Sequence, residues 1–199
     1  MRVLVACEFS GIVRDAFIAA GHDALSVDLL PTERPGPHYR GDVRDVLADG
    51  FDLMVAHPPC THLAVSGARW FAEKARAEQT ALDLDILESP RDQVEALQFV
   101  ADLLAAPIPR IALENPRSVI SSRIRPADQM IHPWQYGHGE RKETCLWLVN
   151  LPPLVPTRLV AGRRPTTYLE PPGPSRARNR SRTYPGIAEA MAQQWGNLT

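Results

Sequence analysis

A cysteine and a glutamate each follow an apolar segment, and together they have the groups needed for covalent chemistry. Cys60 follows the mostly apolar run 51–56 through a His-Pro-Pro turn. Proline fixes the backbone φ angle, so this turn is stiff and directs the thiol. Glu114 follows the apolar run 110–113 and precedes an Asn-Pro pair. A thiol nucleophile and a carboxyl group in such positions are typical of covalent catalysis with acid assistance.

Each of these residues also has an ordinary interpretation. A free cysteine is most often a small buried hydrophobe, which is what we expect of Cys7 and Cys145 within their apolar strand patterns. The two prolines and the segment end favour a nucleophile at Cys60 instead. Glu114 has a helix cap or a surface ion pair as its alternatives, and the Asn-Pro pair that follows makes both unusual.

The hydrophobic pattern alternates between strands and helices. We predict strands at 3–6, 24–27, 51–56, 111–113 and 144–149, a strand or turn at 41–43, and helices at 12–20, 89–104 and 186–195. Short links between alternating elements are typical of an α/β fold with a doubly wound, mostly parallel sheet. Ligands bind beyond the carboxyl ends of such strands, which is where Cys60 and Glu114 fall.

Caps and apolar faces define the helices more closely. Gly21 is expected to end the first helix, and Ser89 to cap the helix at 89–104. The predicted apolar face of that helix consists of Val94, Leu97, Val100, Leu103 and Leu104. The charged, alanine-rich region 64–88 is expected to be helical in part and to lie near the site.

The chain has 199 residues, enough for one α/β domain with a full core. We divide it into a catalytic domain at 1–150, a reduced recognition region at 151–185 rich in arginine and proline, and a C-terminal helix at 186–199 that packs back on the domain. Between Arg158 and Arg182 there are seven arginines and one acid, Glu170. Such one-sided charge favours phosphate contacts, with a merely solvated loop as the alternative. The predicted DNA contacts are Arg163, Arg164, Arg176, Arg178, Arg180 and Arg182.

Two further patterns indicate a nucleotide-like cofactor. The Phe9–Gly11 turn between the first strand and helix resembles a nucleotide-binding turn, in which glycine lets the backbone approach a ligand. Asp28, at the end of the second strand, suits the hydroxyl groups of a ribose. Asp42 either accepts from an adenine amine or only shapes its Gly-Asp turn.

In this order the motifs resemble the cytosine-5 DNA methyltransferase family, and most closely its short phage or prophage members. The turn at 9–11 is similar to its Phe-Ala-Gly cofactor turn, and Asp42-Val43 to its adenine-binding pair. The catalytic Pro-Cys loop is matched by 58–61 and the Glu-Asn-Val motif by 114–116, while 136–143 resembles the segment before its Gln-x-Arg-x-Arg signature. The chain departs from the family in that signature, where Glu140, Lys142 and Thr144 stand, and in lacking the closing Gly-Asn-Ser motif.

The resemblance implies a Rossmann-like methyltransferase domain that uses S-adenosylmethionine and releases S-adenosylhomocysteine. The cofactor residues it implies are Phe9, Ser10, Gly11, Asp28, Leu29, Asp42, Val43 and Pro59. Cys60 would add to carbon 6 of a cytosine flipped out of DNA, and Glu114 would hydrogen-bond its ring nitrogen 3 and amine. Arg141 or Lys142 would supply positive charge near the thiolate. Region 61–88 would fold over the base.

Other functions stay open at this point. The small recognition region also suits a methyltransferase of RNA or of a free cytosine nucleotide, and a non-catalytic DNA-binding protein would share the fold. A methyltransferase of exocyclic amines prefers an aromatic residue after the two prolines, so Cys60 argues against it. The four histidines at 57, 62, 132 and 138 have no ligand spacing, so we expect no metal.

The remaining composition indicates where the protein works. Three widely spaced cysteines form no disulfide framework, which fits a reducing cytoplasm. The first residues read as a strand rather than a signal peptide, and no apolar run approaches the roughly 18 residues of a membrane helix. We therefore expect a soluble cytoplasmic protein that does not contact a membrane, either a monomer or a homodimer. A net charge of -1 leaves DNA binding to local clusters of arginine.

Overall fold

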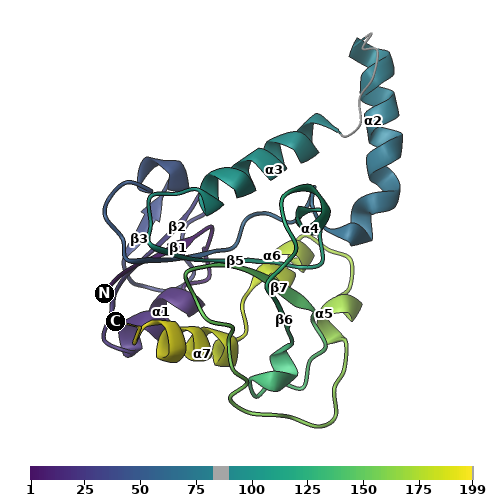
Figure 1. Cartoon of the computed structure of the whole chain (residues 1–199). Helices are drawn as coiled ribbons and strands as arrows, with labels where there is room; N and C mark the ends of the chain where they lie inside the picture. The colour runs from purple at the N-terminus through teal and green to yellow at the C-terminus, as the bar shows by residue number, and fades with distance from the viewer. Residues whose placement is uncertain (83–89, 199) are drawn as a thin grey trace.

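A computed structural model describes residues 1–82 and 90–198. Within these ranges one seven-stranded sheet forms the centre of the protein, in the order β3-β2-β1-β4-β5-β7-β6 (Figure 1). Its strands are β1 (Arg2–Ala6), β2 (Asp23–Asp28), β3 (His38–Arg40), β4 (Leu53–Ala56), β5 (Arg110–Asn115), β6 (Gln129–Ile131) and β7 (Thr144–Val149). The first five strands in the order are parallel, and β7 is antiparallel to both of its neighbours. The predicted doubly wound, mostly parallel sheet is confirmed.

Helices cover both faces of this sheet. The helices are α1 (Ile12–Ala19), α2 (Ala68–Leu82), α3 (Arg91–Leu104), α4 (Ile120–Arg123), α5 (Thr166–Leu169), α6 (Arg176–Ser181) and α7 (Pro185–Trp195). Short 3-10 turns are η1 (Val43–Asp45), η2 (Val65–Gly67) and η3 (Pro133–Gln135). In Figure 1, α1 and α7 lie together on one face and α3 on the other, while α2 extends away from the sheet.

Successive residues of each parallel strand enter opposite cores, because side chains alternate across a strand. Val3 and Val5 of β1 pack against α1 and α7, whereas Leu4 packs into the core on the α3 side. Both cores contain residues with no exposed surface, so the central strands are rigidly held. The carboxyl ends of β1, β2, β4 and β5 consequently meet along one stable edge.

Most predicted elements are present within a residue or two, and the differences have local causes. The turn at 41–43 follows the short strand β3 and is not itself a strand. Glu114 lies within β5 rather than after it, opposite Leu146 of β7. The three-residue strand β6 was not predicted. It is too short to show an alternating pattern and depends on its pairing with β7.

The predicted apolar face of α3 is partly wrong. Val100 and Leu103 are buried, but Val94 is 53% exposed and its neighbour Gln93 is 3% exposed. The Gln93 amide donates a hydrogen bond to the carbonyl of His62 at 3.0 Å, which turns this face of the helix toward the loop after Cys60. Ser89, the predicted cap, and the part of the 64–88 region at 83–88 lie outside the described residues.

The C-terminal part of the chain returns to the sheet. Its segment 151–185 is largely loop with the short helices α5 and α6, and α7 then packs against α1 through Ile187, Met191 and Trp195. These side chains are among the apolar positions that the sequence pattern assigned to this helix. Among the described residues, no helix combines the length and apolar character needed to cross a membrane.

Candidate active site

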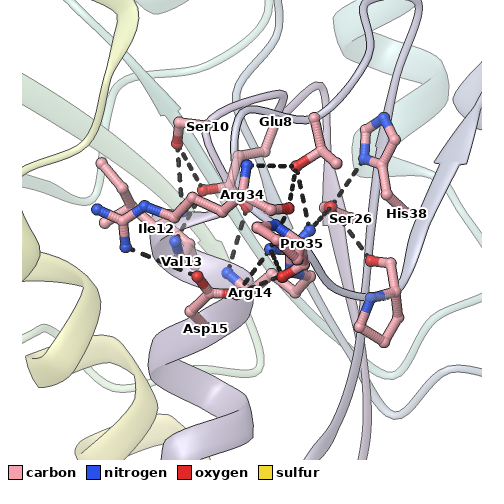
Figure 2. A network of polar contacts seen from close by, with 12 residues as sticks. Glu8, Ser10, Ile12, Val13, Arg14, Asp15, Ser26, Arg34, Pro35 and His38 are labelled. Carbon is pink, nitrogen blue, oxygen red and sulfur yellow. Dashed lines mark hydrogen bonds and ion pairs between the residues drawn. The ribbon is translucent and has the colours of Figure 1, made fainter.

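The turn after β1 is built around an internal carboxylate (Figure 2). Glu8 is 5% exposed and accepts hydrogen bonds from the backbone amides of Val13, at 2.7 Å, and Arg14, at 3.2 Å. These amides open α1, so Glu8 satisfies donors that have no partner within the helix. The Ser10 hydroxyl donates to the same carboxylate at 3.0 Å. Ser10 and Glu8 therefore fix the start of the helix together.

Gly11 is needed in this turn because a side chain would not fit there. Its φ angle is 71°, and a Cβ atom there would lie 2.5 Å from the Arg14 guanidinium. A side chain would thus be strained and would collide with Arg14, which gives Gly11 a role different from the expected approach to a ligand. Phe9 is also a predicted residue of this turn. The guanidinium of Arg178 lies over its ring, with 5.4 Å between the guanidinium carbon and the ring centre.

Arg14 holds the proline-rich loop 31–37 from inside the protein. Its side chain has no exposed surface, and it forms an ion pair with Asp15 at 2.7 Å. It also donates hydrogen bonds to the hydroxyls of Ser26 and Thr32 and to the carbonyls of Arg34 and Pro35, each at 3.2 Å. Figure 2 shows how these groups converge on one guanidinium. The loop that follows β2 is therefore anchored to α1.

A pocket of about 240 Å³ lies at the carboxyl ends of β1 and β2. It is lined by Cys7, Val27, Asp28, Leu29, Gly41, Asp42, Val43, Arg44, Pro59 and Phe99. Five of the eight predicted cofactor residues are in this lining, while Phe9, Ser10 and Gly11 are not. The sequence positions 28, 42 and 59 are thus brought to one cavity by the parallel strands.

The pocket contains two acids whose pKa values are shifted in opposite directions. Burial raises the pKa of Asp28, although its Oδ1 accepts a hydrogen bond from the Leu30 amide at 2.8 Å. Asp42 caps η1 and forms an ion pair with Arg44 at 2.5 Å, and this bonding lowers the pKa of its carboxyl. Asp42 therefore does shape its turn, whereas Asp28 forms no ion pair among the described residues and has only the charge of His38 acting on it.

Cys7 differs from its prediction as a core strand residue. It follows β1 with a φ angle of 58° and lines the pocket. Burial raises the pKa of its thiol to about 12, with Asp28 and Asp42 acting in the same direction. The thiol is therefore uncharged near neutrality. Cys145, by contrast, is buried within β7 as expected.

Cys60 lies in an ordered loop at the end of β4. Its carbonyl accepts hydrogen bonds from the amides of Leu63 and Ala64 at 3.0 and 2.9 Å. The Asn115 side chain donates to the Pro58 carbonyl at 2.9 Å, which ties this loop to the end of β5. Because the bond is buried and joins residues 57 positions apart, the loop that carries the thiol is held beside the strand that carries Glu114.

Cys60 as a whole is exposed, but its sulfur lies among protein atoms that disfavour the charged thiolate. This burial of the sulfur raises the pKa of the thiol, and the nearby charge of Glu114 raises it further. The charges of Lys142 and Arg180 act in the opposite direction. Cys60 and Glu114 are thus close enough to influence each other, as their predicted roles require.

Glu114 is held as a carboxylate. Its side chain is 11% exposed, and its Oε2 lies 2.9 Å from Nδ1 of His57. Burial opposes ionisation, but the hydrogen bond with His57, the charge of Lys142 and the side chain of Thr144 together lower the pKa of Glu114. The site therefore combines a protonated thiol with an ionised carboxylate.

The structure separates the two candidate basic residues. Lys142 acts on both Cys60 and Glu114, and its ammonium donates to the carbonyl of Arg180 at 3.0 Å. Arg141 is exposed and is held through its backbone amide, which donates to Glu140 and Arg164. The side chain of Thr144, two residues further on, also acts on Glu114. Of the two candidates, Lys142 is the one whose charge reaches both Cys60 and Glu114.

The predicted DNA-binding arginines occupy several environments. Arg178 and Arg182 form ion pairs with Glu33 at 2.5 and 2.7 Å, and their hydrogen bonds lower the pKa of that acid. Arg163 stacks on the ring of Trp134 at 3.6 Å. Arg164 is exposed and Arg176 is half-buried, and the charge of Arg180 acts on Cys60. The arginines therefore serve partly to hold α6 against the domain.

Sequence reasoning did not identify Glu8, Arg14, Glu33, His57 or Thr144 as parts of this region. His57 could have been found, since a titratable side chain three residues before a nucleophile is a candidate in its own right. Glu33 and Thr144 act through contacts between distant segments. Glu8 and Arg14 act within the turn and loop next to α1, where the sequence has no pattern that marks them. Within the described residues, no three His, Cys, Asp or Glu side chains are grouped as a metal site.

Comparison with known proteins places the fold. No protein-family model and no curated protein matches the sequence. Among solved structures, the chain is similar to a candidate DNA modification methyltransferase encoded within an E. coli prophage, with 12% identity and a TM-score of 0.50 over 80% of this chain and 52% of that one. It is also similar to the Dnmt2 methyltransferase of S. pombe, with 14% identity and a TM-score of 0.44 over 77% of this chain and 50% of that one.

The chain spans about half the length of these two structures. At such low identity the prophage protein is informative about the fold alone. The chain thus has the Rossmann-like α/β fold of a methyltransferase, as its sequence predicts.

Proposed function

We propose that this protein is a methyltransferase that transfers a methyl group from S-adenosylmethionine to carbon 5 of cytosine in DNA through a covalent Cys60 adduct. The observation that carries the proposal is the buried hydrogen bond between Asn115 and the Pro58 carbonyl, which holds the Cys60 loop beside Glu114 at one edge of the sheet. The charges of Glu114 and Lys142 act on the Cys60 thiol from there. This edge also contains the pocket lined by Asp28 and Pro59. A nucleophile, an acid-base group and a pocket for part of the cofactor are what the reaction needs.

The pocket suits the nucleoside part of S-adenosylmethionine. Its volume of about 240 Å³ is somewhat below the ~300–1,000 Å³ typical of sites that hold whole ligands. Asp28, half-buried and free of an ion pair among the described residues, would accept from the ribose hydroxyls, and Leu29 and Val43 would contact the adenine. When bound, the cofactor supplies an electrophilic methyl group on a sulfonium. Pro59 belongs to both the pocket and the Cys60 loop, which would bring that methyl group beside the thiol.

The protonation states of the site fit the first step. Carbon 5 of cytosine is a poor nucleophile until sulfur adds to carbon 6. Cys60 starts with its proton and Glu114 starts without one, as the directions of their pKa shifts require. As the sulfur–carbon bond forms, the thiol proton passes to Glu114 and then to ring nitrogen 3, so charge is balanced. Carbon 5 then takes the methyl group.

The later steps restore the site. The proton on carbon 5 passes to solvent, and its bonding electrons form the double bond between carbons 5 and 6 as the bond between sulfur and carbon 6 breaks. Nitrogen 3 then returns its proton through Glu114 to the Cys60 thiolate. Lys142 would stabilise the thiolate in both directions, and its charge would also favour the electron-rich adduct. A base in duplex DNA must be flipped out to reach Cys60, and the exposed Arg163 and Arg164, with the half-buried Arg176, would contact phosphates around it.

Two measurements test the proposal. Tritium from labelled S-adenosylmethionine should appear in DNA, and competition with RNA and with free cytosine nucleotide should leave this transfer unchanged. DNA containing 5-fluorocytosine should form an adduct that survives denaturing electrophoresis, because fluorine cannot leave carbon 5 as a proton does.

Cys60→Ser should abolish both signals while cofactor binding persists, and Cys145→Ala is the matched control because that thiol is buried away from the pocket at Asp28. An adduct that forms with Cys60→Ser would refute the nucleophile assignment. Transfer to RNA or nucleotide in preference to DNA would refute the substrate.

A further inference from the structure

His57 occupies a position that the proposed reaction has not yet used. It directly follows β4, where its backbone amide donates to the Ala6 carbonyl at 2.9 Å. Its side chain is 8% exposed, and Nδ1 lies 2.9 Å from Oε2 of Glu114. Its other ring nitrogen, Nε2, is buried and has no hydrogen-bond partner among the described residues. The imidazole is thus packed between the strand end and the carboxylate.

The contact determines which nitrogen of His57 carries the proton. An ionised carboxylate only accepts hydrogen bonds, so Nδ1 must donate to Glu114. A second proton on Nε2 would leave a buried N–H without an acceptor, which folded proteins rarely tolerate. The contact therefore places a proton on Nδ1, facing Glu114, while Nε2 has no acceptor among the described residues.

We propose that His57 is a positioning residue that holds Glu114 by Oε2 and keeps it a carboxylate until Cys60 releases its proton. The inference rests on the methyltransferase function proposed above, because it names the group that prepares Glu114 for that reaction. His57 itself touches neither the pyrimidine nor the cofactor. Its effect passes through one hydrogen bond to the residue that exchanges protons with both the thiol and the base.

Several groups face Glu114 and share control of its charge. Lys142, from the segment before β7, favours the carboxylate, as the hydrogen bond from His57 does. The thiols of Cys60, in the loop after β4, and Cys145, in β7, both feel the negative charge of Glu114. Removing His57 leaves Lys142 in place, so Glu114 should lose part of its stabilisation and take up a proton at a higher pH than before.

Three variants separate positioning from packing. His57→Leu fills much of the same space but has no donor, so Glu114 loses both its orientation and a stabilising hydrogen bond. His57→Asn keeps an N–H near the position of Nδ1 and cannot ionise near neutral pH. His62→Leu is the matched control, because His62 is 42% exposed and pairs only with the surface acid Asp92 among the described residues.

The central experiment is the pH profile of single-turnover methyl transfer to DNA. We expect His57→Leu to lower the rate about 10- to 100-fold near neutrality, as is typical when a residue that orients a reacting group is lost. Its acid limb should also move to higher pH, because Glu114 is protonated more easily. His57→Asn should recover most of the rate and the wild-type limb, and His62→Leu should match the wild type. An unchanged acid limb in His57→Leu would overturn the inference, even if the rate falls.

A second measurement requires no activity. The nitrogen-15 NMR spectrum of histidine-labelled wild-type protein reports which ring nitrogen of His57 is protonated, with His57→Leu used to assign the signal. A proton on Nδ1 that is lost or moved in Glu114→Gln would support the pair, whereas a neutral ring protonated on Nε2 would overturn it. If methyl transfer to DNA is absent from the wild type while the Nδ1 proton is present, the proposed function fails and the His57–Glu114 pair stands.

Discussion

The buried guanidinium of Arg14 offers a quantitative test of how the cofactor side of the sheet is held. Arg14→Met keeps a long apolar stem but removes hydrogen bonds to two hydroxyls and two loop carbonyls, together with the ion pair to Asp15. Hydrogen bonds to charged groups contribute about 1.5–3 kcal/mol each, but the loop carbonyls can regain water once they are released. Asp15 is 35% exposed and keeps its pair with Arg34, so no uncompensated buried charge remains. We therefore expect a loss of about 2–4 kcal/mol, mainly from the hydrogen bonds.

The assay is urea denaturation followed by circular dichroism, with thermal melting in parallel. For a domain of this size each kcal/mol shifts the melting temperature by about 2–4 °C, so Arg14→Met should melt about 10 °C lower. Arg14→Lys should lose an intermediate amount, because an ammonium keeps the charge but cannot match the planar fork of donors.

The matched control is Arg34→Met. Arg34 also pairs with Asp15, at 3.6 Å, but its side chain is 50% exposed. Exposed pairs contribute about 0–1 kcal/mol, so this variant should be close to the wild type. If Arg14→Met lost less than about 1 kcal/mol and resembled Arg34→Met, the burial argument would be refuted and the loop would have to be held by other contacts.

Three further predictions concern the site. At a fixed pH near 8, iodoacetamide should alkylate Cys60 faster in Glu114→Gln, because this change removes a charge that raises the thiol pKa. Alkylation should be slower in Lys142→Met, because this change removes a charge that lowers the thiol pKa. Peptide mass spectrometry gives both rates, and the reverse order would contradict the electrostatics. Asp28→Asn should weaken S-adenosylmethionine binding by about 10-fold or more in calorimetry, since hydrogen bonds to a charged group are lost, and unchanged affinity would remove Asp28 from the cofactor site. Glu33→Ala should release two arginines, so that DNA affinity falls more steeply with salt in fluorescence anisotropy, and an identical slope would show that these arginines do not reach phosphates.

Much of the fold could be predicted because its elements carry local signals. The strands β1, β2 and β4 are short apolar runs. Helix α1 ends at Ala19, and Gly21 follows it with a φ angle of 87°, as a helix C′ position favours. The residues at the ends of these strands converge because parallel strands share an edge. That topology alone predicts that Asp28, Pro59 and Cys60 lie at the same edge of the sheet.

What could not be predicted depends on pairings between distant segments. The sequence presents Arg141 and Lys142 as equivalent neighbours, and only the folded structure shows that the charge of Lys142 reaches Glu114. Likewise, nothing near Arg178 reveals that it meets Glu33, 145 residues away. The placement of Val94 and Gln93 failed for a related reason, since a hydrogen bond to the loop at His62 outweighed the apolar pattern of the helix.

The carboxylate of Glu8 has a consequence for ligand recognition. In many nucleotide-binding folds the free amides that open the first helix attract an anionic group of the ligand. Here those amides already have a resident negative charge from the chain itself. An incoming molecule with an acidic tail would be repelled from this helix end, so its tail must find donors on the surrounding loops. The loops therefore determine which acidic tails are recognised, so this specificity can change with the loop sequence while the helix and sheet stay the same.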